Sequence, residues 1–474
     1  MTSNTVLDLF KEITTIPRES GKEAPMTAFL CNWAKEHSLP CKTDAIGNVC
    51  ITRPASPGKE DVPTLVLQAH QDMVCEKKPG FRHDFSKDPV PYEIEDGWMI
   101  ARNTTLGADD GIGIAACLAL MESDKPMGKV ESIFTISEET GMDGAFAMEE
   151  GFFTGKTLIN LDSEDEGQLF IGCAGGEHTD AVFNCSSEPV KAGSTLVSIE
   201  ISGGVGGHSG DDINKHRANT VKLLSGFLAA ELEHGFQLVS LEGGGKSNAI
   251  ARECKAVVAT ADADGLKARF EAFAAGLKAE YATDDAGLVF TVQDAPAAGQ
   301  ALESGAAVRL VRALDSTVHG VVRMSPDIPG LVQTSTNLAA VKMTGDGKVK
   351  VFTSQRSSVV AELDAIVEEV AANFAACGAE VDSYNKYPGW EPNLDSHILK
   401  VCVESYKRLF RQEPLVLAIH AGLECGLFLE KFPGLDMISF GPTLRGVHAP
   451  GEKLELASMD RFVELLDDVV CNFK

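Results

Sequence analysis

The chain has 474 residues, which is too many for one ordinary core, so we expect two domains. Hydrophobic residues make up 44% and charged residues 23%, a composition that excludes a disordered chain and is typical of globular proteins. The formal net charge of -27 repels phosphate backbones and anionic lipids, so we expect no nucleic acid and no membrane among the partners.

The N-terminal stretch MTSNTVLDLFKEITTIPRES has no basic region followed by an apolar one, so we expect no signal peptide. No apolar run reaches the length of a membrane span. The 12 cysteines are scattered singly, without a CxxC pair, which argues against a zinc knuckle or a redox motif. Free thiols suit a reducing compartment, and we therefore expect a cytoplasmic protein.

Helices and strands alternate in the first part of the chain. Apolar spacing predicts helices over residues 5–15 and 24–37, and a third that begins near Ala108. Short β-rich apolar runs predict strands over Thr64–His70, Val130–Ser137 and Thr157–Asp162. This alternation indicates an α/β core with largely parallel strands.

A second series of elements follows a predicted crossover at Ser187–Thr195. Its expected helices cover Asn214–Glu233, Asp262–Ala279, Ser304–Ser316 and Val359–Cys377, and its expected strands cover Lys255–Thr260, Leu288–Val292, Thr336–Lys342 and Lys350–Ser354. Pro and Gly in YPGWEPN mark another boundary, after which a helix, the strand Asp436–Phe440 and a final helix are expected. We therefore predict one domain split over 1–186 and 392–474, with a second domain, 187–391, inserted into it.

Carboxylates and imidazoles follow the predicted strands where each strand ends. They are His70 and Asp72, which alternation places on the same side with Gln71 opposite, then Asp109 and Asp110 at a helix start, Glu138 and Glu139, Asp162, and His448. Singly, each has an ordinary explanation, such as a solvated turn or a helix cap. Functional sites in α/β sheets assemble at the carboxyl ends of the strands, so the combination favours a site at this edge.

The ordered strings QAHQDMV, TLGADDGIG, ISEETG, LDSEDEG and GVHAP resemble the zinc-dependent aminopeptidase and carboxypeptidase superfamily, which has a co-catalytic dizinc centre. IGCAGGE, GGHSGDDI, SNAIARE and HAGLECG further resemble the aminoacyl-histidine dipeptidase family, also called cytosol non-specific dipeptidase, over essentially the whole chain. The resemblance implies a dizinc exopeptidase-like α/β catalytic domain with a central, mostly parallel sheet. It also implies an inserted α+β lid and dimerisation domain, and a homodimer.

The same resemblance implies the metal ligands. Asp109 would bridge two Zn²⁺ ions, with His70 and Asp162 completing one and Glu139 and His448 the other. Asp110 stands where relatives often carry Asn, which leaves open which of the two aspartates bridges. A cis peptide bond between Asp109 and Asp110 is also implied. Co²⁺ and Mn²⁺ are alternative ions for such oxygen and nitrogen ligands.

The resemblance makes Asp72 the partner that orients the His70 ring and Glu138 the general base. A water held by zinc has its pKa lowered from ~15.7 towards ~7, and Glu138 would take its proton and pass it to the leaving amine. The chain has no GxSxG and no Cys–His pairing that we can place, which disfavours a covalent mechanism.

Residues of the inserted domain are candidates for substrate binding. The resemblance implies that His208 donates to the oxyanion, often across a dimer interface; the alternative is a solvated turn. Asn248 and Arg356 are candidates for holding the terminal carboxylate, to which Arg suits a bidentate contact, although Arg356 also reads as an exposed residue at a helix start. Glu424 would bind the free amine or be structural. His420 has the same ambiguity and is not assigned to the metal set.

These observations predict metal-dependent hydrolysis of short peptide substrates, namely dipeptides with a free N-terminus, Xaa-His and broader. Closure of the lid would exclude water and restrict the substrate to short peptides. The alternatives are a related hydrolase (an aminoacylase, a deacetylase or a tripeptidase) and a non-catalytic homologue that acts as a binding protein.

Overall fold

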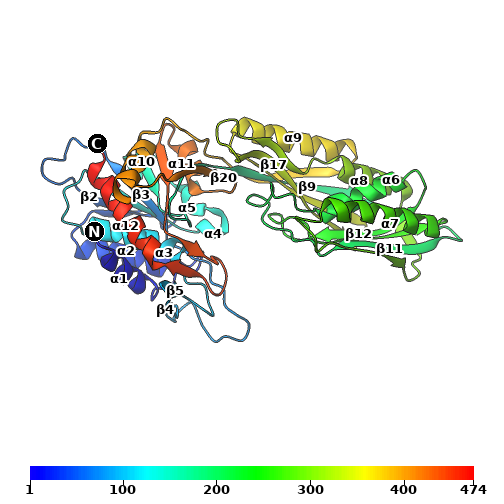
Figure 1. Ribbon diagram of the computed structural model, residues 1–474, viewed down its shortest axis with the longest axis horizontal. Helices are drawn as coiled ribbons and strands as arrows, with labels where there is room; N and C mark the ends of the chain where they lie inside the picture. Colours follow the sequence, from blue (N-terminus) through cyan, green and yellow to red (C-terminus); the bar gives the residue numbers. More distant parts are fainter. The chain divides into compact units, whose positions relative to one another are not determined.

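The computed structural model describes all 474 residues, which form two compact units. The first unit comprises Met1–Gly172, Trp390–Ala418 and Leu423–Lys474, and the second comprises Cys173–Gly389 and Ile419–Gly422 (Figure 1). None of the helices combines the length and hydrophobicity that a membrane-spanning helix requires.

The first unit is built on an eight-stranded sheet. Its strands in spatial order are β1 (Cys41–Thr43), β2 (Val49–Arg53), β6 (Val130–Thr135), β3 (Leu65–His70), β7 (Thr157–Asn160), β21 (Asp436–Ser439), β8 (Gln168–Cys173) and β20 (Leu415–Ile419). β6, β3, β7 and β21 run parallel, whereas β2 and β8 pair antiparallel at either side of them. The predicted mixed α/β fold with a central, mostly parallel sheet is confirmed.

Helices and short strands surround this sheet. The helices are α1 (Ser3–Ile13), α2 (Ala24–Glu36), α3 (Ala108–Met121), α4 (Glu138–Gly141), α5 (Asp143–Ala147), α10 (His397–Phe410), α11 (Glu424–Lys431) and α12 (Leu456–Asn472). A small antiparallel sheet has the order β22 (Leu444–Arg445), β23 (Lys453–Glu455), β5 (Trp98–Ile100) and β4 (Glu93–Glu95). Every residue of β3 and β6 is buried, as expected for central strands that are covered on both faces.

The second unit has a nine-stranded antiparallel sheet. Its path is β14 (Val289–Asp294), β11 (Thr195–Ser202), β13 (Cys254–Thr260), β12 (Gln237–Gly244), β17 (Val332–Thr344), β18 (Lys348–Ser357), β9 (Gly175–Asn184) and β19 (Glu380–Tyr387), with β16 (Gly320–Met324) paired to β17. Two short strands, β10 (Ser187–Pro189) and β15 (Gln300–Leu302), form a separate ribbon.

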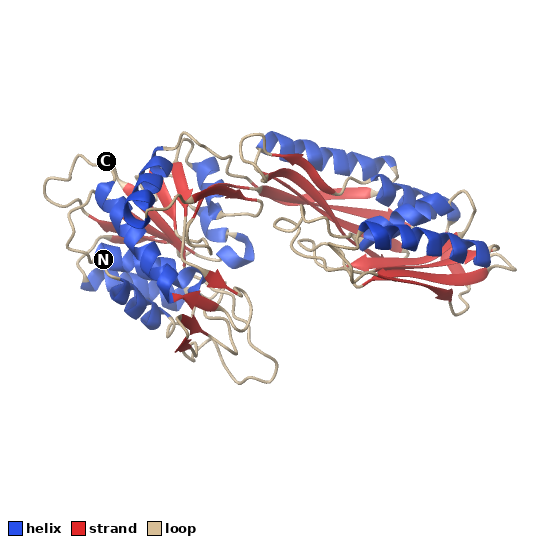
Figure 2. Cartoon of the chain, viewed as in Figure 1, coloured by secondary structure: helices blue, strands red, loops and turns tan.

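Four helices cover the sheet of the second unit: α6 (Thr220–Glu231), α7 (Ala263–Glu280), α8 (Ser304–Ser316) and α9 (Val360–Ala376) (Figure 2). One apolar core lies between helices and sheet and includes Val197, Leu224, Phe270, Leu310 and Phe374.

Several predicted boundaries differ from those in the structure. The second unit begins at Cys173 rather than near residue 187, because β9 pairs with β18 and β19 and so belongs to the second sheet. Residues 419–422, expected in the catalytic domain, also belong to the second unit. Helix α6 begins at Thr220 rather than at Asn214, because the Asn219 side chain caps it by accepting from the backbone N–H of Lys222.

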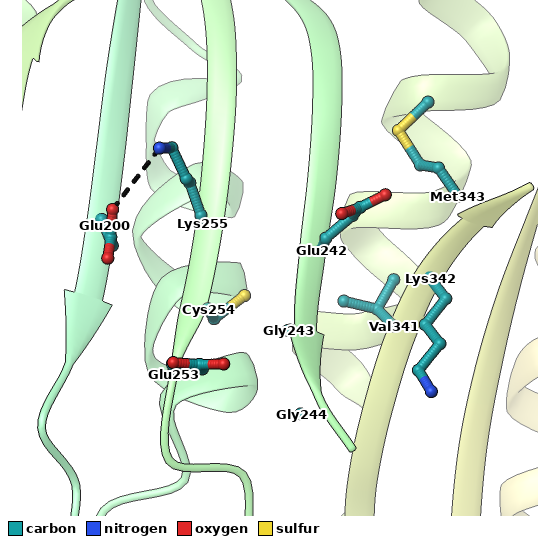
Figure 3. Close-up of a pocket in the computed structure, with 10 residues that line it drawn as sticks. All are labelled: Glu200, Glu242, Gly243, Gly244, Glu253, Cys254, Lys255, Val341, Lys342 and Met343. Carbon is teal, nitrogen blue, oxygen red and sulfur yellow. Dashed lines mark ion pairs between the residues drawn. The ribbon is translucent and has the colours of Figure 1, made fainter.

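A surface groove crosses β11, β13, β12 and β17 of the second unit (Figure 3). An ion pair of 3.6 Å joins Lys255 and Glu200 there. None of the residues predicted to carry chemistry lines this groove.

Candidate metal centre and substrate-binding residues

The imidazoles of His70 and His448 face the same carboxylate from two sides. Nε2 of His70 lies 2.9 Å from Oδ1 of Asp109 and 3.6 Å from Oδ1 of Asp162. Nε2 of His448 lies 3.0 Å from Oδ2 of Asp109 and 2.9 Å from Oε2 of Glu139. The structure therefore brings together all five predicted ligands, with Asp109 at the middle.

Each of these side chains comes from a different part of the fold. His70 ends β3, Asp109 lies in the first turn of α3, and Glu139 lies on α4 just after β6. Asp162 follows β7, and His448 lies in the loop between β22 and β23. His448 has a left-handed backbone, with φ at 60°, which is uncommon for a residue with a side chain and is often found at functional sites.

The donor set fits divalent metal ions. Three groups have ligand atoms close enough to share an ion: His70, Asp109 and Asp162; Asp109, Glu139 and His448; and His70, Glu138 and Glu139. Oε1 of Glu139 is buried and has no hydrogen-bond partner. Imidazole nitrogens and carboxylate oxygens are the ligands that zinc accepts, and the first two groups share Asp109.

These groups shift one another's pKa values. Burial, followed by the nearby Asp109 carboxylate, raises the pKa of Asp162 to about 7. Hydrogen bonds to Asp109 and Glu139 raise the pKa of His448 to about 11. Burial acts to lower the pKa of His70, but Asp162, Asp109 and Asp72 together raise it well above its ordinary value. These shifts follow from the close packing of carboxylates and imidazoles, which is the arrangement that a divalent cation needs.

Asp109 and Asp110 have separate partners. The two carboxylate oxygens of Asp109 face the two histidines, whereas Asp110 accepts hydrogen bonds from the backbone N–H groups of His70 (3.3 Å) and Gly113 (3.1 Å). The peptide bond between the two aspartates is cis, as predicted. This geometry favours Asp109 over Asp110 as the shared ligand.

Asp72 links the His70 ring to the backbone of the glutamate pair. Its Oδ1 lies 3.3 Å from Nδ1 of His70 and accepts from the backbone N–H of Glu138 at 3.0 Å. Its Oδ2 accepts from the backbone N–H of Glu139 at 3.2 Å and from the Ser20 hydroxyl at 2.8 Å. One buried carboxylate therefore lies against the ring of a candidate ligand and bonds to the backbone of the segment that carries Glu138.

Gln71 points to the other side of β3, as strand alternation predicts. Its amide donates to the carbonyls of Gly47 and Phe134, both at 2.9 Å, and accepts from the Thr27 hydroxyl at 2.8 Å. The alternation predicted from the sequence is confirmed at this strand end.

Three of the four candidate substrate-binding residues lie in the second unit. Nδ1 of His208 is 3.3 Å from Oδ2 of Asp211, and the pKa of Asp211 is lowered first by its hydrogen bond to His208 and, among smaller effects, by the charge of Arg356. Asn248 is exposed, and its carbonyl accepts from the N–H of Ser209, the residue after His208. The structure thus places these residues in one region of the second unit.

Glu424 is fully buried in the first unit. Its Oε2 accepts from the Gln68 amide at 2.6 Å and from the Thr135 hydroxyl at 2.8 Å, while Oε1 has no hydrogen-bond partner. Burial, among further effects, raises its pKa to about 8. Oε1 is therefore available to bind an amine, whereas the hydrogen bonds of Oε2 are those of a structural residue.

The sequence matches the model of peptidase family M20/M25/M40 over residues 66–472. The chain belongs to this family. The match covers every segment that supplies a candidate metal ligand, from His70 at the end of β3 to His448.

Among characterised members, the chain is 37% identical over 467 residues to the cytosol non-specific dipeptidase of Escherichia coli, covering 98% of this chain and 96% of the relative. Among solved structures, it is similar to the aminoacylhistidine dipeptidase of Vibrio alginolyticus, with a TM-score of 0.92 at 36% identity over 99% of this chain and 96% of that one. The aminopeptidase PepT of Bacillus cereus shares the fold, with a TM-score of 0.65 at 16% identity over 99% and 98% of the two chains.

Two buried charged residues that support the M20-family centre were missed by the sequence analysis. Arg18 donates to the carbonyls of Gln71 (3.2 Å), Asp72 (2.7 Å) and Gly107. Glu452 accepts from the three N–H groups of residues 106–108, at 2.7, 3.1 and 2.8 Å, and so fixes the start of α3 before Asp109. Arg18 and Glu452 bond only to backbone atoms here, so no pattern of side-chain types in the sequence signalled their roles.

Proposed function

We propose that this chain is a dizinc dipeptidase that hydrolyses dipeptides with a free N-terminus, including Xaa-His. The observation that carries the proposal is the position of Asp109, whose two oxygens face His70 at 2.9 Å and His448 at 3.0 Å. Such a carboxylate suits two cations that share one ligand. The similarity to two dipeptidases over nearly the whole chain supports the choice of substrate.

In this proposal His70 and Asp162 complete one zinc site, Glu139 and His448 complete the other, and Asp109 belongs to both. Co²⁺ and Mn²⁺ are the alternative ions for these ligands. When bound, the pair of ions would supply Lewis-acid chemistry, which lowers the pKa of a water from ~15.7 towards ~7 and polarises the peptide carbonyl.

Glu138 is proposed to be the general base. Its carboxylate belongs to the same cluster as His70 and Glu139. Burial and, after it, the nearby acidic side chains raise the pKa of Glu138 well above its ordinary value, although His70 opposes them. A carboxylate with a raised pKa can accept a proton from the attacking water and return it to the leaving amine. Asp72 is a positioning residue in this scheme, because it fixes the backbone N–H of Glu138.

For substrate recognition, we propose that Arg356, with Asn248, holds the terminal carboxylate and that His208 donates to the oxyanion. Arg356 has a buried Nε without a partner, which is available to an anion. The unpartnered Oε1 of Glu424 is the candidate acceptor for the substrate amine.

We also propose a cytoplasmic protein that forms a homodimer, with the second unit acting as lid and dimerisation domain. The word "cytosol" in the name of the E. coli relative supports the location. Sedimentation equilibrium of the full chain would test the dimer: a mass of one chain at micromolar concentration would contradict it.

The function is tested by metal analysis and a substrate panel on the purified chain. We expect two zinc ions per chain and turnover of Ala-His and other dipeptides. Faster turnover of N-acyl amino acids would instead favour an aminoacylase or deacetylase, and faster turnover of tripeptides a tripeptidase. Two bound ions without any hydrolysis would favour a binding protein.

A further inference from the structure

Four residues of the second unit form one cross-strand row. Arg356 on β18 is directly opposite Ser335 on β17 and directly opposite Gly176 on β9. Gly176 in turn is opposite Tyr387, the last residue of β19. Residues that pair directly across neighbouring strands point to the same face of a sheet, so Ser335, Arg356 and Tyr387 share one face.

A bulge in β19 brings Tyr387 into this row. Tyr384 pairs with His178, but Tyr387 pairs with Gly176, so three steps along β19 match two steps along β9. Asn385, inside this irregularity, has a left-handed backbone with φ at 53°. Regular pairing would place Lys386 opposite Gly176. Bulges commonly re-aim a side chain in this way beside functional sites.

Gly176 and Gly422 leave the space that the Tyr387 ring occupies. A Cβ atom at Gly176 would lie 2.6 Å from the Tyr387 hydroxyl oxygen, and one at Gly422 would lie 3.0 Å from a ring carbon. The tyrosine therefore reaches across an entire strand to Arg356. These two glycines lie in the strings IGCAGGE and HAGLECG, which the metal centre does not explain.

The result of this packing is a direct contact between two polar groups. Nη1 of Arg356 donates to the Tyr387 hydroxyl at 2.9 Å. Since arginine only donates, the phenol oxygen accepts and its own proton remains available to an anion. At the other end of the row, the Ser335 hydroxyl lies 2.7 Å from Nε2 of the buried His420. This contact flanks Arg356 on the side away from Tyr387.

We propose that Tyr387 is a positioning residue that holds the Arg356 guanidinium for a substrate carboxylate and adds a second donor beside it. The inference rests on the proposed function of Arg356 in dipeptide binding. It predicts that Tyr387 sets the preference for a free C-terminal carboxylate, rather than the rate of the chemical step.

The experiment measures binding without turnover, in full-length, zinc-loaded protein that carries Glu138→Gln. Ala-His and its C-terminal amide are titrated by calorimetry into this parent and into a version that also carries Tyr387→Phe. We expect the acid-to-amide affinity ratio to fall about tenfold, as befits loss of a hydrogen bond to a charged group. Tyr384→Phe is the matched control, because the Tyr384 hydroxyl bonds Asp180 instead, and the ratio should not change.

A double-mutant cycle separates positioning from a general structural effect. In an Arg356→Gln background, Tyr387→Phe should change the ratio by a clearly smaller factor than in the parent, because the part of its effect that acts through Arg356 is already lost. An unchanged ratio in the Tyr387→Phe protein, or equal effects with and without Arg356, would overturn the inference. Wild-type protein that binds the acid with this preference yet hydrolyses no dipeptide would overturn the proposed function and leave the role of Tyr387 supported.

Discussion

Three of the five candidate metal ligands of the first unit end or follow parallel strands, while Asp109 opens a helix and His448 lies in the loop between β22 and β23. The row of Arg356 and Tyr387 instead crosses neighbouring antiparallel strands of the second unit. In the first unit, the shared direction of β3, β6 and β7 brings His70, Glu139 and Asp162 to one edge of the sheet. In the second unit, the contact between Arg356 and Tyr387 depends on the register of the strands and on the bulge in β19. It also depends on Gly176 and Gly422, which leave room for the tyrosine ring. The comparison suggests that chemistry is concentrated in the first unit and selectivity in the second.

The most severe test of this division is Glu138→Gln. The amide cannot accept a proton, so kcat should fall by ~10²–10⁴-fold, the usual contribution of a general base. Zinc content should stay the same, because none of the five proposed ligands is altered. The measurements are steady-state kinetics on Ala-His and elemental analysis of the same sample. Loss of zinc together with activity would make Glu138 a ligand and contradict its assignment as the base.

Removal of the metal should lower the unfolding free energy of the first unit and leave that of the second unchanged. At a zinc concentration ~1,000-fold above Kd, binding stabilises the folded state by about 4 kcal/mol, so a chelator should cost the first unit a similar amount. All three tryptophans, Trp33, Trp98 and Trp390, lie in the first unit, so their fluorescence reports its unfolding alone. The urea midpoint by fluorescence should fall with chelator. An unchanged fluorescence midpoint would argue against tightly held ions.

The same contrast explains how far the sequence could predict the molecule. The resemblance to the dizinc superfamily predicted that His70, Asp109, Glu139, Asp162 and His448 meet, and their ligand atoms do lie together. Strand and helix patterns supported the prediction for the first four, whereas His448 lies in a loop that only the string GVHAP pointed to. Helix α8 was predicted with its observed bounds. Strands β9 and β19 were not predicted. Without β9 the boundary at Cys173 could not be placed. Without β19, which is largely exposed and polar, Tyr387 could not be placed.

Glu452→Gln tests whether the buried Glu452 carboxylate stabilises the start of α3 beside Asp109. The carboxylate accepts from three backbone N–H groups before Asp109, and an amide in its place would turn a donor towards at least one of them. We expect a loss of about 1–3 kcal/mol in the unfolding free energy of the first unit. Zinc affinity should fall about tenfold, as for other residues that orient ligands. Glu464→Gln on the exposed face of α12 is the control, and an equal loss there would discount the role of Glu452.

The smallest effect concerns His420, which lies beside the Arg356 row in the second unit. Burial and the charge of Arg356 lower its pKa to about 3, with Asp211 opposing and His208 adding to the shift. Between about pH 6.5, the ordinary value for an unfolded histidine, and pH 3, the unfolded chain binds a proton that the folded chain does not. The contribution of His420 to the unfolding free energy should therefore be constant above pH 6.5 and should lower that free energy by about 1.4 kcal/mol at pH 5.5.

His420→Asn should remove the loss of stability between pH 7.5 and 5.5. The test compares a difference between two pH values, so it still holds if the substitution changes the stability equally at both. The measurement is the difference in unfolding free energy between pH 7.5 and 5.5, from urea titrations followed by circular dichroism. His234→Asn, an exposed histidine of the same unit, should leave the difference as in the wild type. If His420→Asn leaves it unchanged too, the imidazole accepts its proton in the folded state, and the row that contains Arg356 is open to water rather than closed by the Ser335–His420 contact.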